Sequence, residues 1–130
     1  MIVIDASAMV EALVGTTPDE ELLALLATEV HAPALLDVEV LSALRGLERG
    51  DVITPETATQ AVADYWALTV VRHETRPLSD RVWSLRHQFT SYDACYLALA
   101  EGLDAPLITC DRKMAARGHS AAVTVIDGTR

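Results

Sequence analysis

Short apolar runs that alternate with helix-like segments constrain the fold of this chain more than any other feature. The runs are largely uninterrupted by polar residues and fall at residues 2–4, 30–32, 69–72, 106–109 and 123–126. A strand with one face in water alternates apolar and polar residues, whereas a strand covered on both faces does not. Strands of the second kind belong to parallel sheets buried between helices. We therefore predict an α/β fold with a short parallel sheet.

The segments between these runs carry helix start and stop signals. Thr54-Pro55 is a clear start, Ser7 is the expected cap of the first helix, and Gly50 and Gly102 are expected stops. The predicted helices span residues 7–14, 18–27, 35–49, 54–68, 78–89, 91–101 and 112–117.

Length and composition fit one domain of 130 residues with a single core, because half of the residues are hydrophobic. No apolar run reaches the roughly 18 residues that a membrane span needs. The N-terminus has no basic segment before its apolar run, so no signal peptide is predicted and we expect a cytoplasmic protein. Cys95 and Cys110 have no metal-binding spacing and are predicted to be reduced core thiols. The four histidines form no metal-binding pattern.

Four acidic residues stand where this fold brings side chains to one edge of the sheet: Asp5, Glu39, Asp93 and Asp111. Ligand sites of parallel sheets lie beyond the carboxyl ends of the strands, and Asp5 and Asp111 follow two predicted strands. Glu39 falls at the edge of the apolar stripe of its helix, and Asp93 opens a helix that is apolar almost all round. Crowded carboxylates repel each other unless a cation neutralises them, so this arrangement predicts a site for a hard divalent cation.

Each acid also has a structural interpretation. Asp93 and Thr90 fit a capping box, Asp5 and Asp111 are suited to cap the helices that follow them, and Glu39 fits an exposed helix position. The two interpretations are compatible, because a carboxylate at a helix start can also bind a metal ion.

Four segments resemble the acidic motifs of PIN-domain ribonucleases, and more narrowly the VapC toxins of bacterial type II toxin–antitoxin pairs. They are residues 2–8, 38–44, 92–100, which read YDACYLALA, and 107–113, with its Thr-x-Asp at Thr109 and Asp111. The resemblance covers essentially the whole chain, in length and in motif order.

This resemblance implies a single PIN domain over residues 1–130, folded as a small α/β/α sandwich with a parallel sheet. It implies that Mg²⁺ or Mn²⁺ is held by Asp5, Glu39, Asp93 and Asp111, with hydroxyl support from Thr109 and Ser7. It further implies cleavage of a transfer or ribosomal RNA, a homodimer, and inhibition by a cognate VapB-type antitoxin.

The chemistry of phosphodiester hydrolysis suits these residues, because bound Mg²⁺ can activate water and neutralise phosphate oxygens. The net charge of −9 opposes general nucleic-acid binding, but residues 72–130 carry eight bases against seven acids. Arg112 and Lys113 are therefore candidate RNA contacts. Tyr92 and Trp83 are candidates to stack a base, although their apolar neighbours favour packing in the core.

The first two helices carry more apolar surface than a short helical pair can easily hide, at Met9, Val10, Leu13, Leu22, Leu23, Leu25 and Leu26. An antitoxin helix, the sheet itself or a second subunit are the candidate occupants. Two other functions stay open. One is a PIN module that binds RNA or protein without cutting, and the other is a phospho-receiver-like switch, which Asp5 fits poorly because no acid stands beside it.

Overall fold

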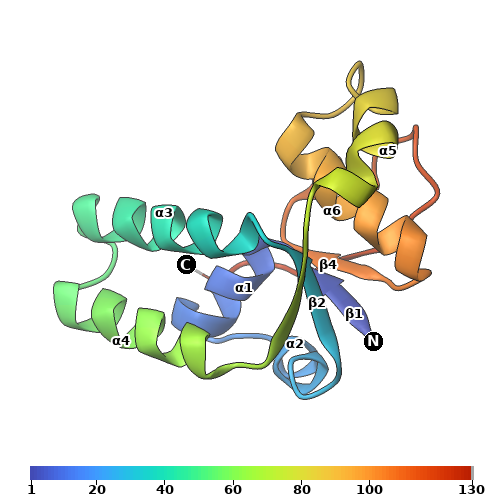
Figure 1. The fold of residues 1–130 in the computed structure, drawn as a ribbon. Coiled ribbons are helices and arrows are strands. Elements are labelled where there is room, and N and C mark those ends of the chain that lie inside the picture. The colour runs from blue at the N-terminus through green and yellow to red at the C-terminus, as the bar shows by residue number, and fades with distance from the viewer. Residues whose placement is uncertain (130) are drawn as a thin grey trace.

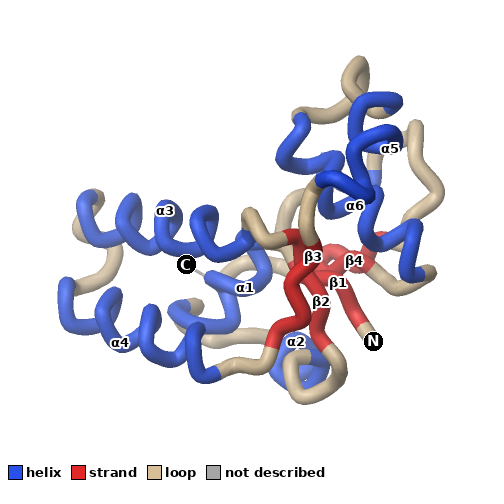
Figure 2. Tube along the Cα trace, in the orientation of Figure 1, coloured by secondary structure: helices blue, strands red, loops and turns tan. Residues whose placement is uncertain are grey.

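A parallel five-stranded sheet organises the computed structural model, which describes residues 1–129 (Figures 1 and 2). Its strand order is β3-β2-β1-β4-β5, and every neighbouring pair is parallel. The strands are β1 (Ile2–Ile4), β2 (Val30–Pro33), β3 (Val70–His73), β4 (Leu107–Thr109) and β5 (Val123–Val125). The predicted α/β class and parallel sheet are confirmed.

Helices connect consecutive strands and cover both faces of the sheet. They are α1 (Ala6–Val14), α2 (Glu20–Leu25), α3 (Leu36–Arg49), α4 (Pro55–Ala67), α5 (Ser79–Ser84) and α6 (Ser91–Leu103), with 3₁₀ turns η1 (Arg76–Leu78) and η2 (Arg112–Ala115). Figure 2 shows α1, α3 and α4 on one side of the strands and α5 and α6 on the other. Helix α6 packs against β1, β2 and β4, while α1 packs against α3 and α4.

The core lies where the central strands meet these helices. All three residues of β1 are buried, and α6 buries every side chain from Ala94 to Ala100. The predicted apolar stripe of α3 is confirmed, because Leu36, Val40 and Leu44 are buried. Burial of β1, β2 and β4 at every position explains why these central strands are largely apolar, whereas the edge strands β3 and β5 are only partly buried.

Of the two caps that the sequence offers for α1, Asp5 is confirmed and Ser7 is not, because Asp5 accepts a hydrogen bond from the backbone N–H of Ala8. Two helix ends also differ from the prediction. The helix predicted at residues 78–89 ends at Ser84, whose hydroxyl donates to the carbonyl of Arg81 at 2.7 Å and competes with the helical bond. Gly102 lies inside α6, which ends instead at Asp104 in a left-handed conformation with φ 50°.

No helix within residues 1–129 is long and apolar enough to cross a membrane. Within residues 1–129, neither Cys95, which is buried, nor Cys110, which is half-buried, forms a disulfide bond.

Candidate acidic site

The four predicted acids stand at the carboxyl-terminal edge of the sheet or at helix starts that face it. Asp5 follows β1 and caps α1, and Asp111 follows β4 and caps η2. Strands β1 and β4 are neighbours, with Ile4 paired to Ile108, so both strands deliver their acids to the same edge. Glu39 lies in the first turn of α3 and Asp93 in the first turn of α6.

The charges of these carboxylates act on one another. Burial raises the pKa of Asp5, and the charge of Asp111 raises it further. Burial also raises the pKa of Glu39, to which the charges of Asp5 and Asp93 add. Burial and the charge of Asp111 raise the pKa of Asp93. The structure therefore brings the four acids into one electrostatically linked group, in which the ionised forms of Asp5, Glu39 and Asp93 are disfavoured without a counterion.

Asp5 is the most enclosed of the four, with most of its hydrogen-bonding capacity used inside the protein. Ser7 Oγ donates to Asp5 Oδ1 at 2.6 Å, and the Ala8 backbone N–H donates to the same oxygen at 3.0 Å. Thr109 Oγ1 donates to Asp5 Oδ2. These hydrogen bonds lower the pKa of Asp5 but do not outweigh the burial that raises it. The carboxylate is therefore fixed in orientation but only partly compensated in charge.

The same two hydroxyls also bind the backbone beyond β4. Thr109 Oγ1 accepts from the Asp111 N–H at 2.9 Å, and Ser7 Oγ accepts from the Cys110 N–H at 2.8 Å. Thr109 is fully buried. The pair thus couples the side chain of Asp5 to the backbone that carries Asp111. This is a physical basis for the supporting role that the sequence resemblance implies for Ser7 and Thr109.

Glu39 is held by a residue that the sequence analysis missed. The buried hydroxyl of Tyr96, on α6, donates to Glu39 Oε1 at 2.5 Å across the gap between α6 and α3. Burial raises the pKa of Tyr96 far above its ordinary value, and the hydrogen bond to Glu39 adds to the rise. Tyr96 follows Asp93 by three residues, so helical spacing places both on neighbouring parts of one face. That spacing was the available signal.

Asp93 combines both interpretations made from its sequence position. Thr90 caps α6, and its hydroxyl accepts from the Asp93 N–H at 3.1 Å. The Asp93 carboxylate is half-buried and lies within the electrostatic reach of Asp111 and Lys113. Lys113 approaches Asp111 at 3.6 Å, while the exposed Arg112 pairs with the exposed Asp127 at 3.1 Å.

The predicted site residues fit a hard divalent cation, because they offer only carboxylate and hydroxyl oxygens, and none of them is a histidine or a cysteine. Within residues 1–129, no three acid, histidine or cysteine side chains approach closely enough to enclose an ion as they are placed. Glu39 is turned toward Tyr96 by its hydrogen bond. The four acids therefore form an open, mutually repelling group.

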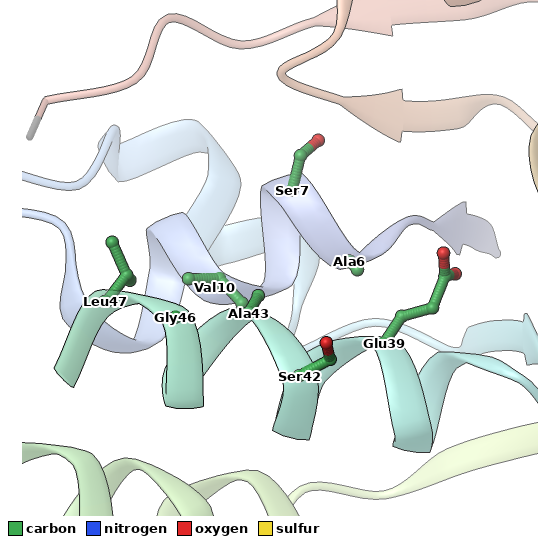
Figure 3. Close-up of a pocket in the computed structure, with 8 residues that line it drawn as sticks. All are labelled: Ala6, Ser7, Val10, Glu39, Ser42, Ala43, Gly46 and Leu47. Carbon is green, nitrogen blue, oxygen red and sulfur yellow. The ribbon is translucent and has the colours of Figure 1, made fainter. Parts of the chain in front are cut away.

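A groove of about 540 Å³ leads away from this group between α1 and α3 (Figure 3). Ser7 and Glu39 stand at the end nearest the acids, and the remaining wall is small or apolar. It is lined by Ala6, Ser7, Val10, Glu39, Ser42, Ala43, Gly46 and Leu47.

Two aromatic residues differ from the sequence prediction. Tyr92 and Trp83 were expected to pack in the core, but they are 64% and 67% exposed. Their apolar sequence neighbours, such as Ala94 and Leu85, take the buried positions instead.

Comparison with known proteins shows which family this chain matches. The family model of the PIN domain matches residues 2–119 of the chain. Ribonuclease VapC12 of Mycobacterium tuberculosis is 42% identical over 129 residues, covering 97% of this chain and 99% of that protein.

Solved structures share the fold at lower sequence identity. PAE2754 from Pyrobaculum aerophilum superposes with a TM-score of 0.71 at 21% identity, covering 94% of this chain and 81% of that one. Mycobacterium tuberculosis VapC20, described as a sarcin-ricin loop cleaving toxin, superposes with a TM-score of 0.66 at 17% identity, covering 92% of this chain and 97% of that one.

Proposed function

Because the chain belongs to the PIN-domain family and is similar to VapC ribonucleases over nearly its full length, we propose that it is the endoribonuclease toxin of a VapBC-type pair. One observation carries the proposal from the structural side. Asp5, Glu39 and Asp93 come from separate parts of the chain to the carboxyl edge of a parallel sheet, and their pKa values are raised by burial and by the charges of neighbouring carboxylates, Asp111 among them. This is where the ligand site of such a sheet belongs. The family assignment removes the phospho-receiver alternative.

Asp5, Glu39, Asp93 and Asp111 would hold the divalent cation, Mg²⁺ or Mn²⁺. When bound, such an ion lowers the pKa of water toward neutrality and neutralises phosphate oxygens. The residues supply the environment for that chemistry. Burial of Asp5 and the crowding of the other carboxylates disfavour the unneutralised group, which promotes cation binding. Nothing in this chemistry requires a protein nucleophile.

The surrounding residues have positioning roles in this proposal. Ser7 and Thr109 fix the Asp5 carboxylate and the backbone at Asp111 in one hydrogen-bonded unit. Tyr96 restrains Glu39 from the opposite side of the site. Carboxylates held in this way lose less conformational entropy when a cation and a phosphate bind.

The substrate in this proposal is a structured RNA, a transfer or ribosomal RNA, in the cytoplasm. Arg112 and Lys113 border Asp111 with side chains that are 80% and 79% exposed, so they are available to a flanking phosphate. The ion pair of Arg112 with Asp127 lies at the surface, and such pairs are weak enough to exchange for phosphate. VapC20, a structural relative, is described as cleaving the sarcin-ricin loop.

The partner in this proposal is a VapB-type antitoxin. The structure divides the predicted apolar surface, because Met9, Val10 and Leu22 are buried in the core. Leu25 packs against the core, whereas Leu13, Leu23 and Leu26 border an apolar groove of about 390 Å³ between α1, α2 and α4, lined by Ala12, Leu13, Leu23, Leu26, Ala27, Asp64 and Leu68. An amphipathic helix with leucine-sized anchors suits such a groove. The homodimer that the family resemblance implies stays a prediction.

Cleavage of a labelled RNA pool by Asp93→Asn tests the function. Asp93 is half-buried at a helix start, so the isosteric amide keeps the fold while it removes a charged ligand. We expect cleavage to fall by about 100-fold or more, and EDTA to abolish the wild-type activity. Asp5→Asn should behave alike.

Glu48→Gln is the matched control, because Glu48 is half-buried like Asp93 but lies near the other end of the helix that carries Glu39. It should cleave RNA at the wild-type rate. Full activity of Asp93→Asn, or wild-type cleavage that persists in EDTA, would refute the assignment of the acids.

A further inference from the structure

The α5–α6 lobe, residues 76–103, presents two large aromatic side chains to solvent beside the acidic site. Tyr92 and Trp83 have among the most exposed large hydrophobic side chains described, at 64% and 67%. Figure 1 shows α5 and α6 together on the side of the sheet opposite α3 and α4. An exposed aromatic ring keeps apolar surface in water, which costs free energy. A binding partner that covers the ring regains that free energy.

The position of Tyr92 follows from that of Tyr96. Residues four apart on a helix lie on the same face, one turn from each other. Tyr96 is buried and reaches Glu39 on α3, so this face of α6 is directed across the site. Tyr92 lies one turn nearer the start of α6 and next to Asp93, which places its exposed ring at the mouth of the acidic site.

Trp83 carries an arginine on its ring. The Arg86 guanidinium lies 4.6 Å from the ring centroid, and Arg86 Nη1 donates to the Trp83 carbonyl at 2.9 Å. Among residues 1–129, no carboxylate lies within ion-pair distance of Arg86 or Arg76. The lobe holds three arginines and three acids, Asp80, Asp93 and Glu101, and its Arg81 is paired with Glu101. It therefore offers two exposed aromatic rings together with two arginines, Arg76 and Arg86, whose charges are not paired with a carboxylate of the described residues.

A second arginine lies on an exposed tryptophan, but its charge is already paired with a carboxylate. Arg72 lies 5.4 Å from the ring centroid of the exposed Trp66, but its Nε donates to both carboxylate oxygens of Asp37, at 2.9 and 3.0 Å. That charge is engaged within the protein. The charge of Arg86, on Trp83, is not paired with a carboxylate of residues 1–129, so the α5–α6 lobe combines stacking surface with charge for a polyanion and the Trp66 pair does not.

We propose that the α5–α6 lobe binds single-stranded RNA, with one unpaired base stacked on Tyr92 beside Asp93 and another on Trp83. The inference rests on the proposed ribonuclease function and names the side chains outside the acidic site that would hold unpaired bases of the substrate. Bases in a duplex are already stacked and cannot lie on a side chain, whereas bases of loops and single strands can. The apolar leucine groove that suits an antitoxin helix is elsewhere, between α1, α2 and α4.

Binding is measured by fluorescence anisotropy with a labelled RNA of about 12 nucleotides, single-stranded or annealed to its complement. An Asp93→Asn background with Mg²⁺ keeps the RNA intact. Tyr92→Leu and Trp83→Leu should each weaken single-strand binding by about 5- to 100-fold, whereas Tyr92→Phe should keep it within about 3-fold. Duplex binding should be weaker than single-strand binding at the outset and change little. Trp66→Leu is the matched control, an exposed aromatic whose arginine is already paired, and should leave affinity unchanged.

Cleavage by otherwise wild-type chains gives a second readout. Tyr92→Leu should raise KM more than it lowers kcat, because the ring binds a base and does not touch the scissile phosphate. Equal affinity of Tyr92→Leu, Trp83→Leu and the parent for the single strand overturns the inference and leaves the ribonuclease function standing. Equal affinity of the parent for single strand and duplex also overturns it. If the wild-type chain cleaves no RNA, the proposed function fails, and the binding comparison still decides whether this lobe holds single strands.

Discussion

Replacement of Thr109 by valine tests whether the hydroxyl pair of the acidic site stabilises the protein as well as its function. Thr109 is completely buried. Its Oγ1 donates to Asp5 Oδ2 and accepts from the Asp111 N–H at 2.9 Å. Valine has nearly the same shape, so the change removes two hydrogen bonds without opening a cavity.

The magnitude follows from what each bond loses. A hydrogen bond to a charged group contributes about 1.5–3 kcal/mol, and a buried N–H left without an acceptor costs about 1 kcal/mol or more. Asp5 retains Ser7 and Ala8 as donors, which limits the first loss. We therefore expect Thr109→Val to lower the free energy of unfolding by about 2–4 kcal/mol, a large part of the 5–15 kcal/mol available to a typical domain.

Urea unfolding at neutral pH in EDTA measures this difference without a contribution from bound cations. Thr109→Ser is the control, because it keeps the hydroxyl and loses one buried methyl group, at a cost of about 1 kcal/mol. The RNA cleavage rate should also fall in Thr109→Val, since the Asp5 carboxylate loses a positioning contact. A valine variant within about 0.5 kcal/mol of wild type, or a serine variant as unstable as the valine one, would refute the reasoning.

Two further predictions concern regions away from the acidic site. Arg81 and Ser120 hydrogen-bond Glu101 and lower its pKa from 4.5 to about 2, so its stabilising contribution is complete above pH 4.5 and is lost as the pH falls toward 2. Because the Arg81 side chain is 42% exposed, Glu101→Gln should lower the free energy of unfolding by only about 1–2 kcal/mol at pH 7. Denaturant titrations measure this difference, and the same difference in free energy of unfolding at pH 2 would contradict the prediction. In the apolar groove between α1, α2 and α4, Leu23→Asp should weaken co-purification with the cognate antitoxin by at least about tenfold without changing RNA cleavage. Val52→Asp, at an exposed position outside the groove, should not weaken co-purification. Retention of the antitoxin by Leu23→Asp would place the antitoxin-binding surface elsewhere.

The fold was predictable because a parallel strand that is buried on both faces is visible in the sequence as a short apolar run. A strand covered on both faces is apolar except where a buried polar side chain is hydrogen-bonded; β1 is apolar throughout, and β4 carries one polar residue, Thr109, whose hydroxyl binds Asp5. Once the strands are placed, the positions of Asp5 and Asp111 at the carboxyl edge follow from topology alone. The proximity of Glu39 and Asp93 depends on how α3 and α6 pack, which helical periodicity restricts to one face but does not determine.

The sequence did not predict which of two neighbouring polar side chains would cap the first helix. Asp5 and Ser7 are both good helix caps, and their order in the chain favours neither. The structure gives the cap to Asp5 and uses Ser7 to bind Asp5 and the backbone at Cys110. That choice depends on β4 lying beside β1, a contact between residues about a hundred positions apart.

The contrast between Tyr92 and Tyr96 shows why the same residue type takes opposite roles on one helix. Both belong to a segment that is apolar almost all round, and both lie on the face directed toward α3. Tyr96 lies over the sheet and is buried, whereas Tyr92 belongs to the first turn and is exposed. The first turn of α6 therefore extends beyond the covered part of the core. Asp93 needs that position, because a carboxylate that binds a cation and a phosphate must be reachable from solvent. The exposure that makes Asp93 available to RNA is the exposure that leaves Tyr92 as a surface for a base.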